Sequence, residues 1–195
     1  MTTDTTTHLT LSQQLKNETA GAHEQMHLLM ERCQPFSSRT NYAQFVTAQY
    51  IFQLDVEGLF SLSEIQSAIP DLEVRGRVQA SRDDLADLQI DLPDVKPRPG
   101  IVMPEALGWL YVSEGSTLGA AFLLKEVKEK LDLSEQFGAR NLAAYPEGRA
   151  IVWRRFTQYL DHTSLNDQKK EAVVAGAHAA FDRFDSLLRQ CFKLD

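Results

Sequence analysis

Two histidines, His23 and His27, lie one helical turn apart in a segment whose apolar residues recur at helical spacing. Side chains four apart share one face of a helix, and histidine pairs at this spacing can chelate a metal ion. The sequence has no third ligand at a recognisable spacing and nothing that resembles HExxH. We therefore expect no closed structural metal site, and each residue could be an ordinary surface or core histidine. His23 remains a candidate ligand for a metal whose other coordination positions are filled by a bound cofactor.

Two glycines, Gly115 and Gly119, lie four apart inside a segment that otherwise has the pattern of a long helix. Each interior glycine costs about 1 kcal/mol relative to alanine, so something should offset that cost. The spacing places both on one face, with Ser116 and Ala120 beside them. Such a bare face allows three explanations: close packing of another helix, contact with a flat ligand, or a kink.

Long helices must position these residues, and the periodicity predicts an all-α chain without strands or internal repeats. We expect residues 1–9 to form a flexible, threonine-rich tail and residues 10–195 to form a single-domain helical bundle. Thr40 should cap the second helix, whose apolar residues on more than one side place it centrally. The expected helices cover residues 9–34, 41–69, 72–88, 104–131, 150–161 and 167–192, with a proline-rich connector over 92–104 and a loop over 138–148.

Composition limits the function classes. A length of 195 residues suits one domain, 43% hydrophobic residues can form a substantial core, and the net charge of −7 gives no overall attraction to nucleic acid. No apolar run approaches the ~18 residues of a membrane span, and the N-terminus lacks a signal-peptide core. Cys33 and Cys191 could pair, but they have no zinc-type spacing and are expected to be idle thiols in a reducing compartment. We expect a cytoplasmic monomer that binds neither nucleic acid nor membrane.

Two segments resemble the haem oxygenases. Leu15 to His23 is similar to the start of their proximal helix, where an L-K-x-x-T-x-x-x-H pattern ends in the iron ligand. Glu105 to Leu123 is similar to the glycine-containing distal helix of bacterial, iron-scavenging members. The resemblance spans about Leu11 to Phe192 and also includes Pro35-Phe36, Tyr42 to Phe45 and Phe137 to Arg140.

The resemblance implies a haem oxygenase fold in which haem lies between the proximal and distal helices. His23 would bind the iron, and Gly115 and Gly119 would let the distal backbone approach the ring closely. Ser116 stands where many members carry a water-organising aspartate, so a longer water chain would deliver protons. Glu114 and Arg140 are candidate anchors of that chain.

The implied reaction is the cleavage of haem to biliverdin, CO and ferrous iron, for iron acquisition, with haem as both substrate and cofactor. It consumes O₂ and electrons. The sequence has no G-x-G-x-x-G after a predicted strand, so the electrons should come from an external donor, a ferredoxin or an NADPH-dependent reductase. Arg154 is a candidate haem contact and, with Lys16 and Arg155, could form a basic patch that faces an acidic partner.

The resemblance also bears on the position of cleavage. Members that cut at the α-meso carbon typically have a lysine and a tyrosine where this chain has Lys16 and Tyr111. In a branch that cuts at β or δ, lysines hold a rotated haem at positions that match Glu31 and Glu126, and carboxylates there would repel the haem propionates. We therefore expect α-meso cleavage.

This chain departs from the family pattern at one further position, and three alternative functions stay open. Many members have a carboxylate where this chain has His27, which leaves the surroundings of the proximal ligand open and makes His27 a rival ligand. A haem carrier or sensor would share the same ligand and clamp. A thiaminase-like helical hydrolase would need a cysteine in its pocket, and a helical interaction module would explain the glycine pair by packing alone.

Overall fold

The fold is a bundle of helices, as the periodicity predicts. A computed structural model describes residues 9–195, and no extended strand forms among them. None of the helices in this range combines the length and apolar character that a membrane-spanning helix needs. The helices are α1 (Leu11–Glu18), α2 (Ala20–Cys33), α3 (Arg39–Glu57), α4 (Ser63–Ala68), α5 (Val78–Asp87), α6 (Glu105–Leu131), α7 (Arg140–Ala143), α8 (Arg149–Asp161) and α9 (Asp167–Phe192), with short 3-10 helices η1 (Gly58–Ser61) and η2 (Leu72–Val74).

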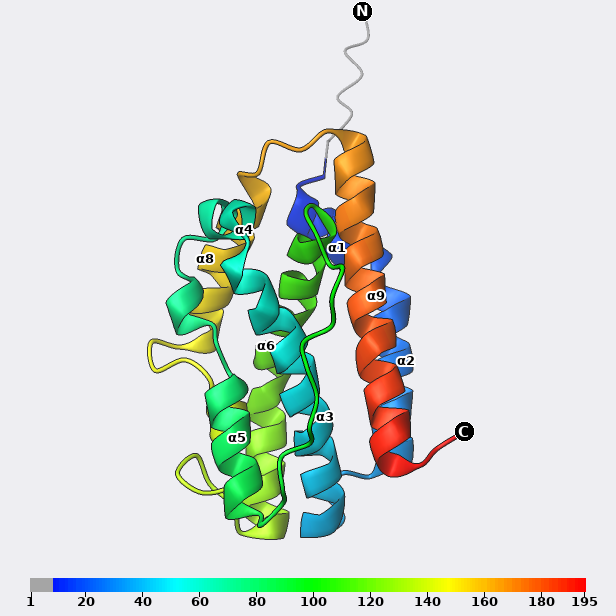
Figure 1. Cartoon of the computed structure of the whole chain (residues 1–195), viewed down its shortest axis with the longest axis vertical. Helices are drawn as coiled ribbons and strands as arrows, with labels where there is room; N and C mark the ends of the chain where they lie inside the picture. The colour runs from blue at the N-terminus through cyan, green and yellow to red at the C-terminus, as the bar shows by residue number, and fades with distance from the viewer. Residues whose placement is uncertain (1–8) are drawn as a thin grey trace, which may run out of the picture.

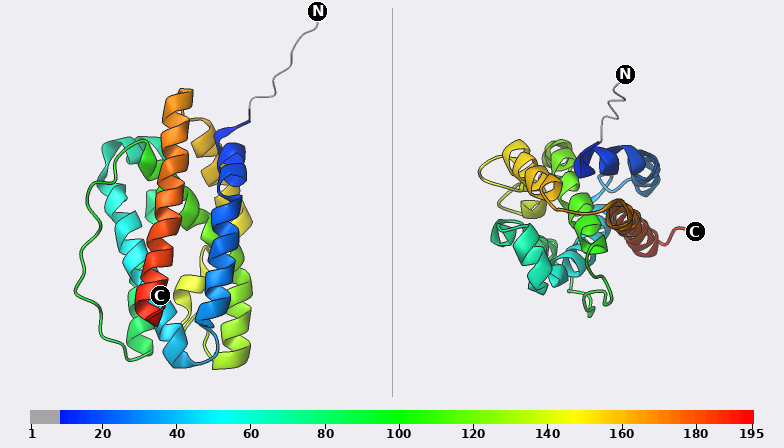
Figure 2. Two further views of the ribbon diagram at one scale, coloured as in Figure 1. Left: turned by 90° about the vertical axis from the view of Figure 1, so that its right-hand side faces the viewer. Right: turned by 90° about the horizontal axis from the view of Figure 1, so that it is seen from above.

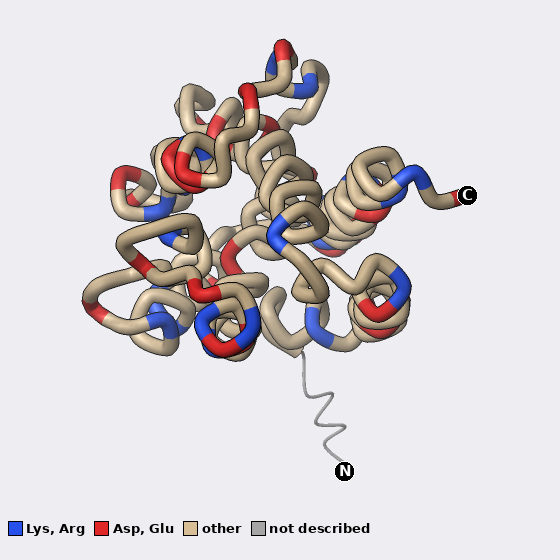
Figure 3. The backbone as a smooth tube through the Cα atoms, turned by 90° about the horizontal axis from the view of Figure 1, so that it is seen from below, with Lys and Arg blue, Asp and Glu red and all other residues tan. Residues whose placement is uncertain are grey.

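Helix α6 runs through the middle of the bundle (Figures 1 and 2) and contacts α3, α7, α8 and α9. Helix α9 in turn lies against α1, α2 and α3. The connector between α5 and α6 follows the outside of the bundle (Figure 1). Acidic and basic positions are interspersed around the helices (Figure 3). Since α6 is central, a ligand held against it is enclosed by several helices at once.

The closest helix contact joins α6 to α9 through a pair of glycines. A Cβ atom built on Gly108 would overlap the carbonyl oxygen of Val173, and one built on Gly176 would overlap the carbonyl oxygen of Glu105. Only glycine permits backbones to approach this closely. Close helix packing therefore occurs on α6, but at Gly108 and not at the Gly115 and Gly119 pair.

The prediction of one helix over 41–69 is wrong at both ends. Helix α3 begins at Arg39, because the Ser38 hydroxyl caps it by accepting a backbone N–H three residues on. Thr40 is therefore inside the helix. The helix ends at Glu57, where Gly58 lies against Pro97 of the connector, and a Cβ on this glycine would be 3.1 Å from that of the proline. A tertiary contact, which local sequence does not encode, accompanies this end.

The prediction of one helix over 72–88 is also wrong, because α5 begins only at Val78. The Glu57 carboxylate accepts the backbone N–H groups of Arg77 and Val78, each at 2.5 Å. A carboxylate at this position satisfies the donors that a new helix leaves free. A residue from the end of α3 therefore sets the start of α5.

Two further boundaries differ. The first predicted helix, from Leu9 to the break at Pro35, is two helices that meet at Thr19, whose hydroxyl donates to the carbonyl oxygen of Leu15 at 2.8 Å. A hydroxyl bonded four residues back often bends a helix. The loop predicted over 138–148 contains the short helix α7, whose first two N–H groups donate to the Asp84 carboxylate at 2.8 and 2.9 Å.

Several predictions are confirmed: the all-α fold, the connector over 92–104, and the helices α6, α8 and α9 to within a residue at each end. The predicted tail, residues 1–9, lies almost wholly outside the described residues. The division into tail and domain therefore stays a prediction.

Candidate functional site

A cavity of about 1270 Å³ opens between α2 and α6. Helices α1 and α2 form one side, α6 forms the other, and α3, α8 and α9 contribute the rest of the wall. Ligand pockets of proteins usually measure about 300–1000 Å³, so this one can hold a large molecule. Aromatic rings line it, among them Phe45, Phe52, Phe181 and Phe184. The shape and lining suit a broad, largely apolar ligand.

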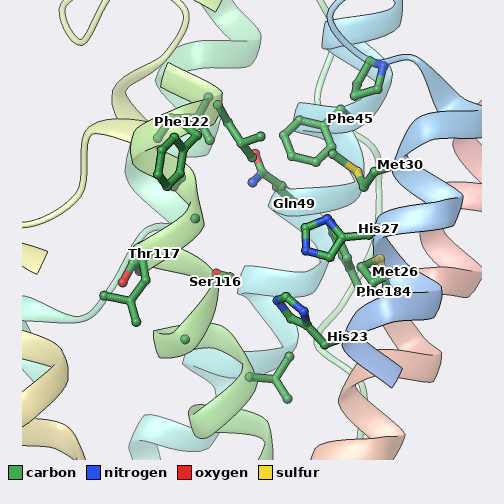
Figure 4. A pocket seen from close by; sticks show the side chains of 18 of the residues that line it. His23, Met26, His27, Met30, Phe45, Gln49, Ser116, Thr117, Phe122 and Phe184 are labelled. Carbon is green, nitrogen blue, oxygen red and sulfur yellow. The ribbon is translucent and has the colours of Figure 1, made fainter. Parts of the chain in front are cut away.

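His23 and His27 project from α2 into the cavity toward α6 (Figure 4). Their ring centroids lie 4.6 Å apart, edge to face, and the ring of Phe181 lies 6.5 Å from that of His23. Burial lowers the pKa of His23, the charge of His27 lowers it further, and Glu24 opposes this. A neutral imidazole is the form that binds a metal. In residues 9–195 no group of three or more His, Cys, Asp or Glu side chains is placed to hold a metal ion.

The α6 wall opposite is bare at the glycine pair. A Cβ atom on Gly119 would meet no atom within 4 Å, and one on Gly115 would touch only the Trp153 ring, at 3.6 Å. Within residues 9–195 no helix backbone comes within 4 Å of a Cβ on either glycine, and α6 continues through this face without interruption. Of the three explanations for the pair, the geometry therefore favours contact with a ligand. Between the glycines, the Ser116 hydroxyl donates to the carbonyl oxygen of Ser113 at 2.7 Å.

Charged and phenolic groups mark the two ends of the cavity. Lys16 and Tyr111 line it near the start of α6, and burial raises the pKa of Tyr111. Glu31 and Glu126 line it near the other end of α2 and α6. The Lys130 ammonium lies 2.5 Å from the Glu126 carboxylate and compensates its negative charge at that end of the cavity.

The sequence patterns did not reveal a polar section of the cavity wall. It contains Gln49, Gln53, Arg77 and Asn141. Asn141 donates to the Gln49 side chain at 3.0 Å, and its own Oδ1 is buried without a partner among the described residues. The signal for the glutamines was available: Gln49 and Gln53 are four apart and flank the apolar run Tyr50 to Phe52. Nothing in the sequence distinguished Arg77 from its neighbouring arginines.

Three candidates do not line the cavity, so Arg154 makes no contact with its interior, and the water-chain roles of the other two stay predictions. Arg154 is exposed on α8, because Trp153 points inward and the next residue is rotated by about 100° around the helix. Glu114 points away and bonds Arg75 at 2.6 Å. Arg140 pairs with Asp84 and Asp87 outside the cavity. Lys16, His23, Tyr111, Gly115, Ser116 and Gly119 all line it.

The cysteines do not support a thiol nucleophile in this cavity. Cys33 and Cys191 are free thiols, and neither is among the lining residues. Burial raises the pKa of both, which disfavours the reactive thiolate. The hydrolase alternative therefore loses its required residue.

Known proteins similar to this chain agree with one another. The family model described as heme oxygenase matches residues 9–190. The chain is 44% identical over 184 residues to heme oxygenase PigA of Pseudomonas aeruginosa, which covers 93% of this chain and 92% of that protein. It superposes on the NO- and CO-bound heme oxygenase from Neisseria meningitidis with a TM-score of 0.90 and 36% identity, covering 96% and 94% of the two chains. The haem complex of heme oxygenase-1 from Synechocystis, at 16% identity and a TM-score of 0.74, shares the fold, covering 93% and 92%.

Proposed function

Because this chain belongs to the haem oxygenase family, we propose that it cleaves haem at the α-meso carbon, with His23 as the iron ligand, to supply iron. The enzyme class itself follows from family membership: haem is the substrate, O₂ and a reductant are consumed, and biliverdin is formed. One observation carries the proposal. Across a cavity of about 1270 Å³, His23 faces the part of α6 where Gly119 presents no side chain.

The residues fit haem as the bound substrate. Since the porphyrin fills the equatorial positions of the iron, one imidazole from the protein suffices. Gly119 leaves room for a flat ring, because even a methyl group there would meet nothing within 4 Å. A haem iron reacts with O₂ when it is reduced, and the protein binds, orients and hydrates the substrate. Ser116 and Arg77 supply polar contacts on the side of the cavity away from His23.

The reductant should come from outside the chain. We propose a ferredoxin or an NADPH-dependent reductase that works in the cytoplasm, in keeping with two free thiols. Lys16 is exposed at the end of the cavity and could contact an acidic donor. We also propose that the chain acts as a monomer.

The turnover test compares the wild type with Gly119→Leu. In air, with ascorbate and catalase present, the wild-type haem complex should lose its Soret band and form biliverdin. The leucine side chain would enter the space of the ring, and a misplacement of about 1 Å can cost about a hundredfold in rate, so turnover should fall roughly a hundredfold. The variant should be no less stable, since leucine favours a helix over glycine by about 0.8 kcal/mol.

Two results would contradict this account. A wild-type haem complex that persists unchanged under reductant and air would indicate a carrier or sensor. Equal turnover by Gly119→Leu would mean that haem does not lie against Gly119.

Regiospecificity follows from the charges at the two cavity ends. Haem propionates are anionic, and Lys16 with Tyr111 offers them a cation and a hydroxyl, whereas Glu31 and Glu126 are acids. The Glu126–Lys130 pair weakens the repulsion at that end but leaves it without excess positive charge. We therefore expect α-biliverdin as the main isomer of the wild type.

Charge reversal in Lys16→Glu should lower the ratio of α to the β and δ isomers. An exposed ion pair contributes at most about 1 kcal/mol, which corresponds to a change of up to about fivefold. Chromatography of the extracted biliverdin isomers gives the ratio. Lys125→Glu, on an exposed part of α6 outside the cavity lining, is the matched control and should leave it unchanged. A wild-type product that is mainly β or δ would overturn the assignment.

A further inference from the structure

Arg77 is a buried cation whose hydrogen bonds go to neutral groups. Its side chain lines the cavity although the residue is only 6% exposed. Its Nη2 donates to the backbone oxygen and the hydroxyl of Ser113 at 2.9 and 2.6 Å, and Nη1 donates to the Tyr145 hydroxyl at 3.3 Å. The Glu114 carboxylate is 3.9 Å from Nη1. No carboxylate in the described chain accepts a hydrogen bond from this guanidinium, so its charge is only partly compensated.

Glu114 is already engaged by two other donors. Its Oε2 accepts from Arg75 at 2.6 Å, and the Tyr145 hydroxyl lies 2.7 and 2.8 Å from its two oxygens. The Tyr145 hydroxyl has one proton to donate, and the ionised Glu114 carboxylate can only accept. Tyr145 must therefore donate to Glu114 and accept from Arg77. The order Arg77, Tyr145, Glu114 fixes the direction of each hydrogen bond and the position of the guanidinium.

The other charged groups around Arg77 do not neutralise it. The Glu57 carboxylate, from the end of α3, accepts the backbone N–H of Arg77 and not its guanidinium. Arg149, from α8, donates to the carbonyl oxygen of Thr117 at 2.6 Å, and its pKa is lowered by burial and then by the charge of Arg77. Arg75 is paired with Asp71 at 2.8 Å as well as with Glu114. Of these charged groups only Arg77 lines the cavity, so it is the charge that a ligand beside the Ser113–Thr117 stretch of α6 would meet.

We propose that Arg77 is the cation that faces anionic ligands of the haem on the α6 side, and that Tyr145 and Glu114 are the positioning residues that hold it there. This rests on the proposed function, since it takes haem as the occupant of the cavity. A fixed positive charge in a site that excludes water stabilises negative charge that develops on a reacting oxygen. Removing the charge should therefore weaken the binding of anions to the haem iron and leave the binding of neutral ligands unchanged.

The test uses azide and CO as probes of the haem complex, without turnover. Azide binding to the ferric complex and CO binding to the ferrous complex are measured by Soret titration in wild type, Arg77→Gln, Arg77→Lys and Tyr145→Phe. For Arg77→Gln we expect azide affinity to fall roughly tenfold or more, since tenfold is the effect of one charge about 12 Å away at an effective dielectric constant of about 20, with CO affinity unchanged. Arg77→Lys should retain most of the azide affinity, and Tyr145→Phe should lose part of it.

Each outcome decides the proposal. Parallel loss of azide and CO affinity in Arg77→Gln would mean that Arg77 only maintains the shape of the cavity. No change in either affinity would mean that Arg77 does not face the ligand. An unchanged azide-to-CO ratio in Tyr145→Phe would overturn the positioning role, and this variant alone decides if Arg77→Gln does not fold. Arg155→Gln, which removes a cation from the same ion-pair network outside the cavity, should match the wild type. Failure of the wild type to bind haem would instead contradict the proposed function.

Discussion

Alanine at position 23 should lower the affinity for haem by at least about a hundredfold and remove the histidine-type Soret spectrum. His23 is the imidazole that the proposal assigns to the iron, and even outer partners of a metal ligand change affinity by about 10–100-fold. Its side chain projects into the cavity (Figure 4), and its pKa lies below the ordinary value because of burial. The neutral ligand form is therefore present at neutral pH. Titration of the apoprotein with hemin gives both the affinity and the spectrum.

His27→Ala is the control for this result, because the two rings lie 4.6 Å apart and line the same cavity. We expect His27→Ala to retain a histidine-ligated spectrum. Added imidazole should restore that spectrum in His23→Ala, since the removed side chain leaves space beside the iron. Loss of the spectrum in His27→Ala, with retention in His23→Ala, would reverse the ligand assignment.

The predictable part of the site lies on two helices with clear sequence patterns. His23 and the pair of Gly115 and Gly119 stood out because a histidine pair and helix-interior glycines are unusual at those spacings. The structure brings all three to one cavity. Their placement required only that α2 and α6 face each other, which the resemblance implied. The chemical roles of these residues stay predictions until they are measured.

The parts that escaped prediction depend on contacts between distant segments. Glu57 sets the start of α5 from the end of α3, and Asp84 of α5 accepts N–H groups of α7. Glu57 holds the backbone of Arg77, and Ser113 and Tyr145 hold its side chain at the cavity. No local spacing carries that information. Arg154 was misplaced for the opposite reason: its charge was considered without the helix face on which it lies.

The contact of α6 with α9 gives the largest expected change in stability. Gly176→Ala should lower the free energy of unfolding by about 3 kcal/mol, because the added Cβ would overlap the backbone of Glu105 and one helix must move. Overpacking in a core usually costs about 1–3 kcal/mol, and here the neighbour is backbone, which cannot rotate away. Domains are stable by only about 5–15 kcal/mol in total. Urea unfolding followed by circular dichroism measures the loss.

The matched control is Gly21→Ala, another helix glycine. A Cβ at Gly21 would meet nothing within 4 Å, so alanine there should be neutral or stabilise by up to about 1 kcal/mol through its higher helix propensity. If both variants were stabilised, the α6–α9 contact would be looser than the geometry indicates, and the cavity wall on α6 would be free to shift. If only Gly176→Ala loses stability, the position of α6 is fixed by its contact with α9. Gly119 can then remain without a side chain, because packing elsewhere on the same helix offsets its cost.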